Sequence, residues 1–269
     1  MKNFPNLVLL CSIYLTTILL GLNTGSFLLP LMYPPEGGEQ VIAPIVQEPE
    51  SVTSSLWIFV YIILVTFILL FLLKRRMGFI IKLALFFSFF MGTLFTMVSV
   101  LGDWGMIATA AMLALVLWKR ESFIVANVAL IFTISGIGAI LGASLGFLPA
   151  LVLLVLMSAY DYVAVFVTKH MVTLAEESKG KFAFMFLIPA GDRIMGLGSG
   201  DIALPLTFTV SVMASHGAGY AVPTAFGGLM GLVWLYYFIQ TKEKITLPAL
   251  PPISIGLILG FAITKFILG

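Results

Sequence analysis

The chain has 269 residues, of which 61% are hydrophobic and 10% charged, and its mean hydropathy is +1.14. Soluble domains carry about 25% charged residues. This composition therefore excludes a soluble globular protein and indicates an integral, multi-pass membrane protein. The formal net charge of +2 does not point to a partner class, and no nucleic-acid partner is expected.

Nine apolar stretches approach or exceed the roughly 20 helical residues that cross a bilayer. They predict an all-α polytopic membrane protein with transmembrane helices at Leu7–Leu22, Leu56–Leu73, Phe79–Leu101, Trp104–Trp118, Phe123–Phe147, Ala150–Thr168, Leu197–Ser215, Ala221–Phe238 and Pro248–Leu268. The first stretch has no clean small-residue cleavage site after it, so we interpret it as a span rather than a signal peptide. The whole chain, residues 1–269, is expected to form one domain, with helices one to six over about 1–168, an inner loop at 169–196 and helices seven to nine over about 197–269.

The basic residues predict the orientation of these spans. If the amino terminus is cytosolic, thirteen of the fourteen Lys and Arg residues lie on the cytosolic side, and only Lys265 lies near the other face. The first outer connection, Tyr33–Ser55, contains four glutamates and no basic residue. By the positive-inside rule, this distribution predicts a cytosolic amino terminus and an external carboxyl terminus.

Two acidic residues, Asp161 and Asp201, fall inside predicted spans, where a carboxylate costs about 2.5 to 3.5 kcal/mol on insertion scales. Asp161 precedes Lys169 by eight residues and Asp201 follows Arg193 by eight, so each lies at most ~12 Å from the cytosolic boundary. Consecutive spans run antiparallel, so the two carboxyl groups can meet. Such a pair shares a proton, as in aspartic proteases. The alternative is a polar pair that hydrogen-bonds two helices together.

Three short motifs in the sixth, seventh and ninth spans resemble the YD, GxGD and PAL motifs of the presenilin and signal peptide peptidase family. They are Tyr160-Asp161, Gly198-Ser199-Gly200-Asp201 and Pro248-Ala249-Leu250. Their order, their span numbers and the predicted topology are all similar to that family, and the chain looks more like a microbial homologue than a human presenilin.

The resemblance implies an intramembrane aspartyl protease that cleaves transmembrane segments of membrane proteins, with membrane lipid around it, in the cell membrane of a microbe. It implies Asp161 and Asp201 as catalytic residues. It also implies that eight residues bind substrate or shape the site: Tyr160, Gly198, Ser199, Gly200, Leu247, Pro248, Ala249 and Leu250.

The residues of these motifs also have physical interpretations of their own. Gly198 and Gly200 lack a Cβ atom, so the backbone is expected to enter the helix through unusual dihedral angles and to let a helix or a substrate approach Asp201. Ordinary close packing explains the same glycines. The prolines of the Leu247–Pro252 stretch are typical of the first turn of a helix, and only the resemblance places this turn beside the site.

Two further patterns carry expectations. Phe182–Ile188 is apolar but only seven residues long, too short to span. We interpret it either as an interfacial flap or as a strand that pairs with an unwound substrate. Gly138, Gly142 and Gly146 form a GxxxGxxxG pattern, which is typical of close helix packing and could also support a homo-oligomer.

Other classes of protein fit the sequence less well. Prepilin and preflagellin peptidases also use a GxGD aspartate, but they generally carry a basic residue shortly after it, where this chain has Ile202–Pro205, and they lack PAL. A proton-coupled transporter could place two acids at one depth, yet the two halves show no convincing repeat. Cys11, His170 and His216 lie apart, and no phosphate-binding loop is present, so neither a metal nor a cofactor is expected.

Overall fold

The computed structural model describes residues 4–35, 38–46, 48–75, 77–119, 122–168, 185–190, 193–240 and 247–268. Within these ranges the chain forms nine α-helices: α1 (Phe4–Met32), α2 (Val52–Lys74), α3 (Gly78–Leu101), α4 (Gly105–Trp118), α5 (Phe123–Ala143), α6 (Phe147–Val163), α8 (Gly200–His216), α9 (Ala218–Gln240) and α10 (Leu250–Leu268). A 3₁₀ turn, η1 (Gly102–Trp104), joins α3 to α4, and a π-helical segment, η2 (Ala164–Thr168), continues α6.

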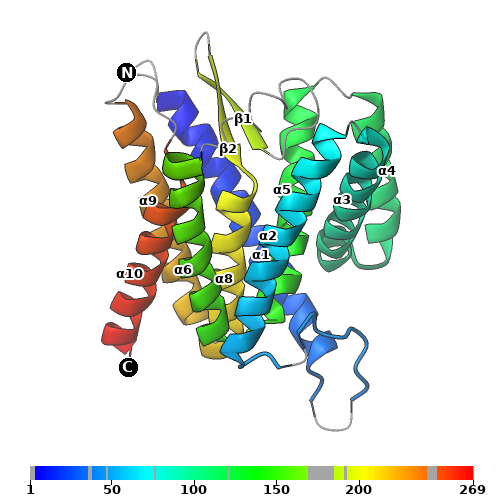
Figure 1. Ribbon diagram of the computed structural model, residues 1–269. Coiled ribbons are helices and arrows are strands. Elements are labelled where there is room, and N and C mark those ends of the chain that lie inside the picture. The colour runs from blue at the N-terminus through cyan, green and yellow to red at the C-terminus, as the bar shows by residue number, and fades with distance from the viewer. Residues whose placement is uncertain are drawn as a thin grey trace.

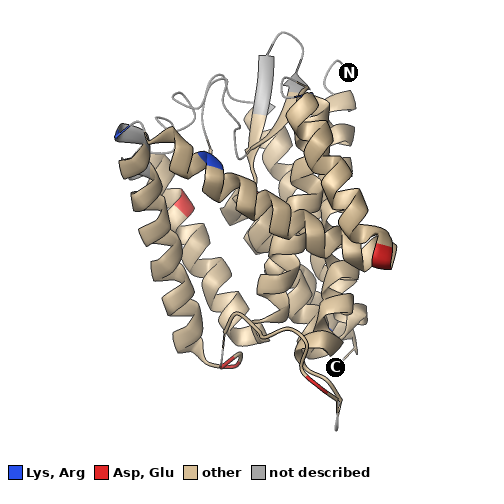
Figure 2. Cartoon of the chain, turned by 90° about the vertical axis from the view of Figure 1, so that its right-hand side faces the viewer, with Lys and Arg blue, Asp and Glu red and all other residues tan. Residues whose placement is uncertain are grey.

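The helices form a bundle with a β-hairpin at one end (Figure 1). The amino terminus lies at the hairpin end and the carboxyl terminus at the opposite end. Lys and Arg residues visible in Figure 2 lie toward the hairpin end, whereas acidic residues lie both in the loop at the other end and on helices between the two ends.

Seven stretches of the described residues are long and apolar enough to cross a membrane. One of these stretches, Gly78–Trp118, contains both α3 and α4. Helix α8 is not among the seven, because its 17 residues make it slightly shorter than any of them. Large apolar side chains on α2 face outward, with Trp57 70% and Phe67 62% exposed, as expected for contact with lipid. The chain is therefore a predominantly helical, multi-pass membrane protein, which confirms the predicted class at this level.

The core lies around α8, whose side chains are buried without a break from Pro205 to Val212. Helices α1, α5, α6, α9 and α10 contribute to the same cluster of buried side chains. Glycines allow the closest approaches. A Cβ atom on Gly142 of α5 would lie 2.5 Å from the carbonyl oxygen of Thr207 in α8, and one on Gly227 of α9 would collide with the carbonyl oxygen of Gly256 in α10. These glycines pack helices within one chain.

Several predicted span boundaries are wrong because hydropathy does not detect where a helix ends. The first helix continues to Met32 rather than ending at Leu22, and α8 begins at Gly200 rather than Leu197. The ninth predicted span begins at Leu250, two residues after Pro248. In each case the flanking residues are apolar too, so composition is similar on both sides of the boundary.

The predicted span Phe123–Phe147 is also too long, because α5 ends at Ala143 and α6 begins at Phe147. Tertiary hydrogen bonds fix this break. The Gly146 N–H donates to the carbonyl oxygen of Pro49 at 2.8 Å, and the Ile45 N–H donates to the Ser144 hydroxyl at 3.0 Å. The first outer connection thus holds the turn between α5 and α6.

The hairpin consists of β1 (Met185–Ala190) and β2 (Arg193–Gly198), which pair antiparallel with Leu187 opposite Gly196. Phe186 and Ile188 are fully buried, so one face of the hairpin packs on the core. Met185–Ile188 does form a strand, but its partner is β2, so the pairing of Phe182–Ile188 with a substrate stays a prediction. Residues 182–184 lie outside the described residues. The strand β2 was not predicted, and its last two residues were assigned to a helix.

Candidate active site

Asp161 and Asp201 lie on two helices that contact each other, α6 and α8. Asp161 is 7% exposed, and Asp201 is partly buried in the first turn of α8. Their carboxyl groups are close enough for a direct electrostatic interaction. Like charges at such range in a low-dielectric interior do not ionise independently, so the arrangement can hold one shared proton.

The first amide of α10 holds the Asp161 carboxyl group. The Leu250 N–H donates to Oδ2 of Asp161 at 3.1 Å, and the backbone of Ala249 gives that carboxyl group a second hydrogen bond. A helix leaves its first N–H groups without internal partners, but Pro251 and Pro252 have no N–H to offer. Asp161 therefore accepts the donors that remain at the start of α10, as a capping side chain from another helix would.

A second backbone amide holds Asp201. The Gly198 N–H, at the end of β2, donates to Oδ2 of Asp201 at 3.2 Å. A Cβ atom on residue 198 would lie 2.9 Å from that oxygen, closer than such contacts normally allow. A side chain at residue 198 would therefore displace the Asp201 carboxyl group from this position. The predicted unusual dihedral angles are wrong, because the described glycines with positive φ are Gly102 and Gly217 alone.

The other GxGD residues play different parts. A Cβ atom on Gly200 would meet nothing within 4 Å, so no close packing of helices requires this glycine, and the space in front of it is open. Ser199 precedes α8, and its carbonyl oxygen accepts from the Ala203 N–H at 2.9 Å. Its side chain makes no capping hydrogen bond.

The side chain of Tyr160 packs against α2, whereas Asp201 lies on α8. Its ring packs edge to face on Phe59 of α2, with the ring centroids 6.5 Å apart. Tyr160 thus contributes to the contact between α2 and α6, immediately next to Asp161.

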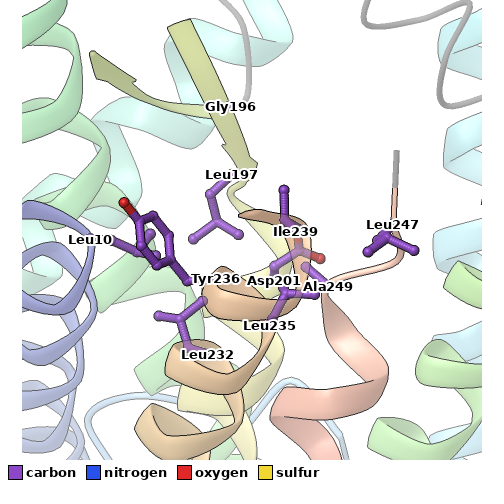
Figure 3. Close-up of a pocket in the computed structure, with 10 residues that line it drawn as sticks. All are labelled: Leu10, Gly196, Leu197, Asp201, Leu232, Leu235, Tyr236, Ile239, Leu247 and Ala249. Atoms are coloured by element: carbon purple, nitrogen blue, oxygen red, sulfur yellow. The ribbon is translucent and has the colours of Figure 1, made fainter. Parts of the chain in front are cut away.

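A cavity of about 90 Å³ lies beside Asp201. A single water needs roughly 10 to 15 Å³ measured in this way, so the cavity has room for water at the carboxyl group. Figure 3 shows the residues that line it, which are mainly apolar: Leu10, Gly196, Leu197, Asp201, Leu232, Leu235, Tyr236, Ile239, Leu247 and Ala249. The PAL segment thus lies beside both carboxyl groups. Leu250 forms a hydrogen bond with Asp161, and Leu247 and Ala249 line the cavity next to Asp201.

Two features near the site were missed from sequence. One is β2, whose Gly196 and Leu197 line the cavity. The other is Asn127 of α5, which is buried and makes two hydrogen bonds to β1. The signal for Asn127 was present, because an amide inside an apolar span needs partners for the same reason as a carboxylate.

Comparisons with known proteins agree with this geometry. The chain matches the family model described as signal-peptide peptidase, presenilin aspartyl protease over residues 36–269. Two solved structures of a presenilin family intramembrane aspartate protease are similar to it, both at 28% sequence identity. The one in space group C222 has a TM-score of 0.66 and the match covers 94% of this chain and 99% of that chain. The one in space group P2 has a TM-score of 0.68, with 95% and 97% covered.

No curated protein matches the chain significantly. The family model nevertheless covers most of the sequence, and the solved relatives cover nearly all of it at a similarity that extends to the whole fold. The chain therefore belongs to the signal peptide peptidase and presenilin family of intramembrane aspartyl proteases.

Proposed function

We propose that Asp161 and Asp201 are the catalytic pair with which this intramembrane aspartyl protease hydrolyses peptide bonds inside transmembrane segments of membrane proteins. The observation that carries the assignment is that a backbone amide of one of the three motifs holds each carboxyl group. Leu250 of the PAL motif holds Asp161, and Gly198 of the GxGD motif holds Asp201. The interaction between the two carboxyl groups supports a pair that shares one proton.

The proposed chemistry uses the two carboxyl groups in opposite protonation states. The ionised carboxylate removes a proton from water while the water oxygen attacks the scissile carbonyl carbon, and the protonated partner donates to the carbonyl oxygen. The tetrahedral intermediate then collapses as a proton passes to the leaving nitrogen and the C–N bond breaks. The cavity beside Asp201 supplies space for the water.

We propose that the substrate binds in an extended form along β2. A helical peptide bond is shielded by its own helix, so the segment must unwind before attack. Gly198 directs its N–H toward Asp201, and Gly196, two residues earlier, directs its main chain to the same edge of the strand because alternate residues share an edge. An added strand at this edge would approach Asp201. We therefore propose the edge of β2, in place of Phe182–Ile188, as the segment that pairs with the substrate.

The finer membrane arrangement is also part of the proposal. Nine spans with a cytosolic amino terminus agree with the nine described helices, with the opposite positions of the termini in Figure 1 and with the basic residues. The site then opens toward the cytosol over a short distance. We propose that residues 1–269 form one protease domain in the cell membrane of a microbe, surrounded by lipid. A homo-oligomer stays a prediction, and Gly138 and Gly142 already pack on α8.

The alternative functions lose support from the family comparison. A prepilin-type peptidase or a proton-coupled transporter would share two membrane-embedded acids, but the matching family model is that of the signal peptide peptidases and presenilins.

The test of this proposal is substitution of each aspartate. We expect Asp161→Asn and Asp201→Asn each to reduce cleavage of a single-span substrate by at least about 100-fold, because neither carboxyl group activates water and polarises the carbonyl alone. Mass spectrometry of the products measures the rate. Size-exclusion chromatography in detergent checks that each variant is folded. Near-normal cleavage by either folded variant would reject the assignment.

A further inference from the structure

Asn127 is a buried polar residue near the start of α5, with 7% of its surface exposed. Its carboxamide binds one residue of β1 twice. Its Nδ2 donates to the carbonyl oxygen of Leu187 at 2.7 Å, and the Leu187 N–H donates to its Oδ1 at 2.9 Å. The two residues are 60 positions apart in the chain, so this is a tertiary contact that joins the hairpin to the helix bundle.

The pair of hydrogen bonds shows which edge of β1 is occupied. In an antiparallel ladder, successive residues direct their N–H and C=O groups to opposite edges of a strand. Leu187 directs both groups to Asn127, and therefore away from β2. The side chain of Asn127 thus takes the place that a third strand would have on the outer edge of β1.

The opposite edge of the hairpin leads to Asp201. Gly196 lies opposite Leu187 in the register, so its main chain points away from β1. Gly198 shares that edge and donates to Asp201. One edge of the hairpin is closed by an asparagine, and the other ends at the proposed catalytic pair.

Helix α5 is also fixed to the helix that carries Asp201. A Cβ atom on Gly138 would lie 3.2 Å from the carbonyl oxygen of Ala203 in α8, and one on Gly142 would lie 2.5 Å from the carbonyl oxygen of Thr207 in α8. The same helix therefore holds the hairpin through Asn127 and contacts the main chain of α8 through its glycines.

We propose that Asn127 is a positioning residue for substrate binding. It fixes the hairpin beside α8 and closes the outer edge of β1, so that an extended substrate pairs with the edge of β2 that leads to Asp201. The effect on cleavage rests on the proposed function. The attachment of the hairpin to α5 through the two hydrogen bonds between Asn127 and Leu187, here called the clamp, does not.

The clamp is tested directly by residue-resolved hydrogen exchange of the full-length protein in detergent. The Leu187 N–H points away from β2, so its protection depends on Asn127. We expect Asn127→Leu, which removes both hydrogen bonds, to accelerate exchange at Leu187 by about tenfold or more. Asn127→Asp keeps an acceptor and loses the donor, and we expect a smaller acceleration.

The matched control is Thr133→Val on the same helix. Thr133 is also buried, with its hydroxyl donating to Ala129 at 2.8 Å and lying 3.2 Å from the Thr93 hydroxyl. Both of these partners lie in helices and not in the hairpin. We expect no change in exchange at Leu187. Unchanged exchange in Asn127→Leu, or in Asn127→Ala if the leucine variant does not fold, would overturn the clamp.

The positioning role is tested by kinetics on a single-span substrate. We expect Asn127→Leu to raise KM about tenfold and to broaden the set of cleavage positions, with kcat within about threefold of the wild type, because substrate register and not the carboxyl pair is altered. Asn127→Gln, which keeps the carboxamide, should restore part of the effect. Faster exchange of the Leu187 N–H together with an unchanged KM and unchanged cleavage positions would overturn the positioning role. If the wild type cleaves no such substrate, the proposed function fails, and the exchange result still decides the clamp.

Discussion

The Leu250 amide and the Asp161 carboxyl group are 89 positions apart in the chain and joined by a hydrogen bond of 3.1 Å. This bond ties the PAL segment to the helix of the YD motif. Two prolines follow Leu250, so few other amides at the start of α10 can take over its role. The orientation of Asp161 therefore depends on the backbone at the start of a distant helix, chiefly on the Leu250 N–H and secondly on Ala249.

Removing that N–H should reduce catalysis without disrupting α10. Proline is tolerated in the first turn of a helix, so we expect Leu250→Pro to fold. Hydrogen bonds to charged groups contribute about 1.5 to 3 kcal/mol, and we expect kcat to fall by about 10- to 100-fold. Leu250→Met keeps the amide and a side chain of similar size, and serves as the control. Equal activity of the two variants would show that the amide does not orient Asp161.

The rate should depend on pH as a bell-shaped curve. The active form has one proton on the Asp161 and Asp201 pair, so activity falls at low pH, where both carboxyl groups are protonated, and at high pH, where both are ionised. Initial rates at low substrate concentration, measured across the range in which the protein stays monodisperse, report this profile. A flat profile over that range would contradict a shared proton.

The edge of β2 should matter through its main chain. Gly196→Pro removes an N–H from the edge proposed to bind substrate, and we expect KM to rise about tenfold. The control is Gly196→Ala, which adds the Cβ atom but keeps the N–H. That Cβ atom meets the flexible side chain of Met185 at 2.6 Å, so its effect should be mild. If both variants have the same KM, main-chain pairing at this position is not used.

The contact between α9 and α10 should be sensitive to a single methyl group. A Cβ atom on Gly227 would collide with the main chain of Gly256, and overpacking typically costs about 1 to 3 kcal/mol. We expect Gly227→Ala to lower the thermal transition by several degrees. Gly219 lies on the same helix with open space around it, so Gly219→Ala should be neutral. A thermal shift assay in detergent compares the two.

The sequence predicted the helical membrane class and the two aspartates at one depth for a physical reason. Apolar runs and basic residues are selected by the bilayer itself, so they can be recognised without tertiary information. A carboxylate in an apolar run is costly, which made Asp161 and Asp201 conspicuous. Their roles remain predictions that the variants above will test.

The hairpin and the helix ends could not be predicted in the same way. The strand β2 contains two glycines in six residues and has low strand propensity, so it is formed through pairing with β1 and not through local preference. Similarly, Ser144–Gly146 interrupts an apolar run because the first outer connection binds there. Long-range contacts set these features, and periodicity does not record them.

The short helix α4 has a consequence for the surrounding lipid. Its 14 residues correspond to about 21 Å, well below the roughly 30 Å of bilayer hydrocarbon. Trp104 and Trp118 mark its two ends and are 70% and 80% exposed, and exposed tryptophan side chains favour the membrane interfaces. If α4 is one of the nine proposed spans, the two interfaces approach each other beside it, by local thinning of the bilayer or by tilting of the protein. Acyl-chain length thus becomes a variable of the enzyme, because a thicker membrane has to be deformed more to accommodate the same helix.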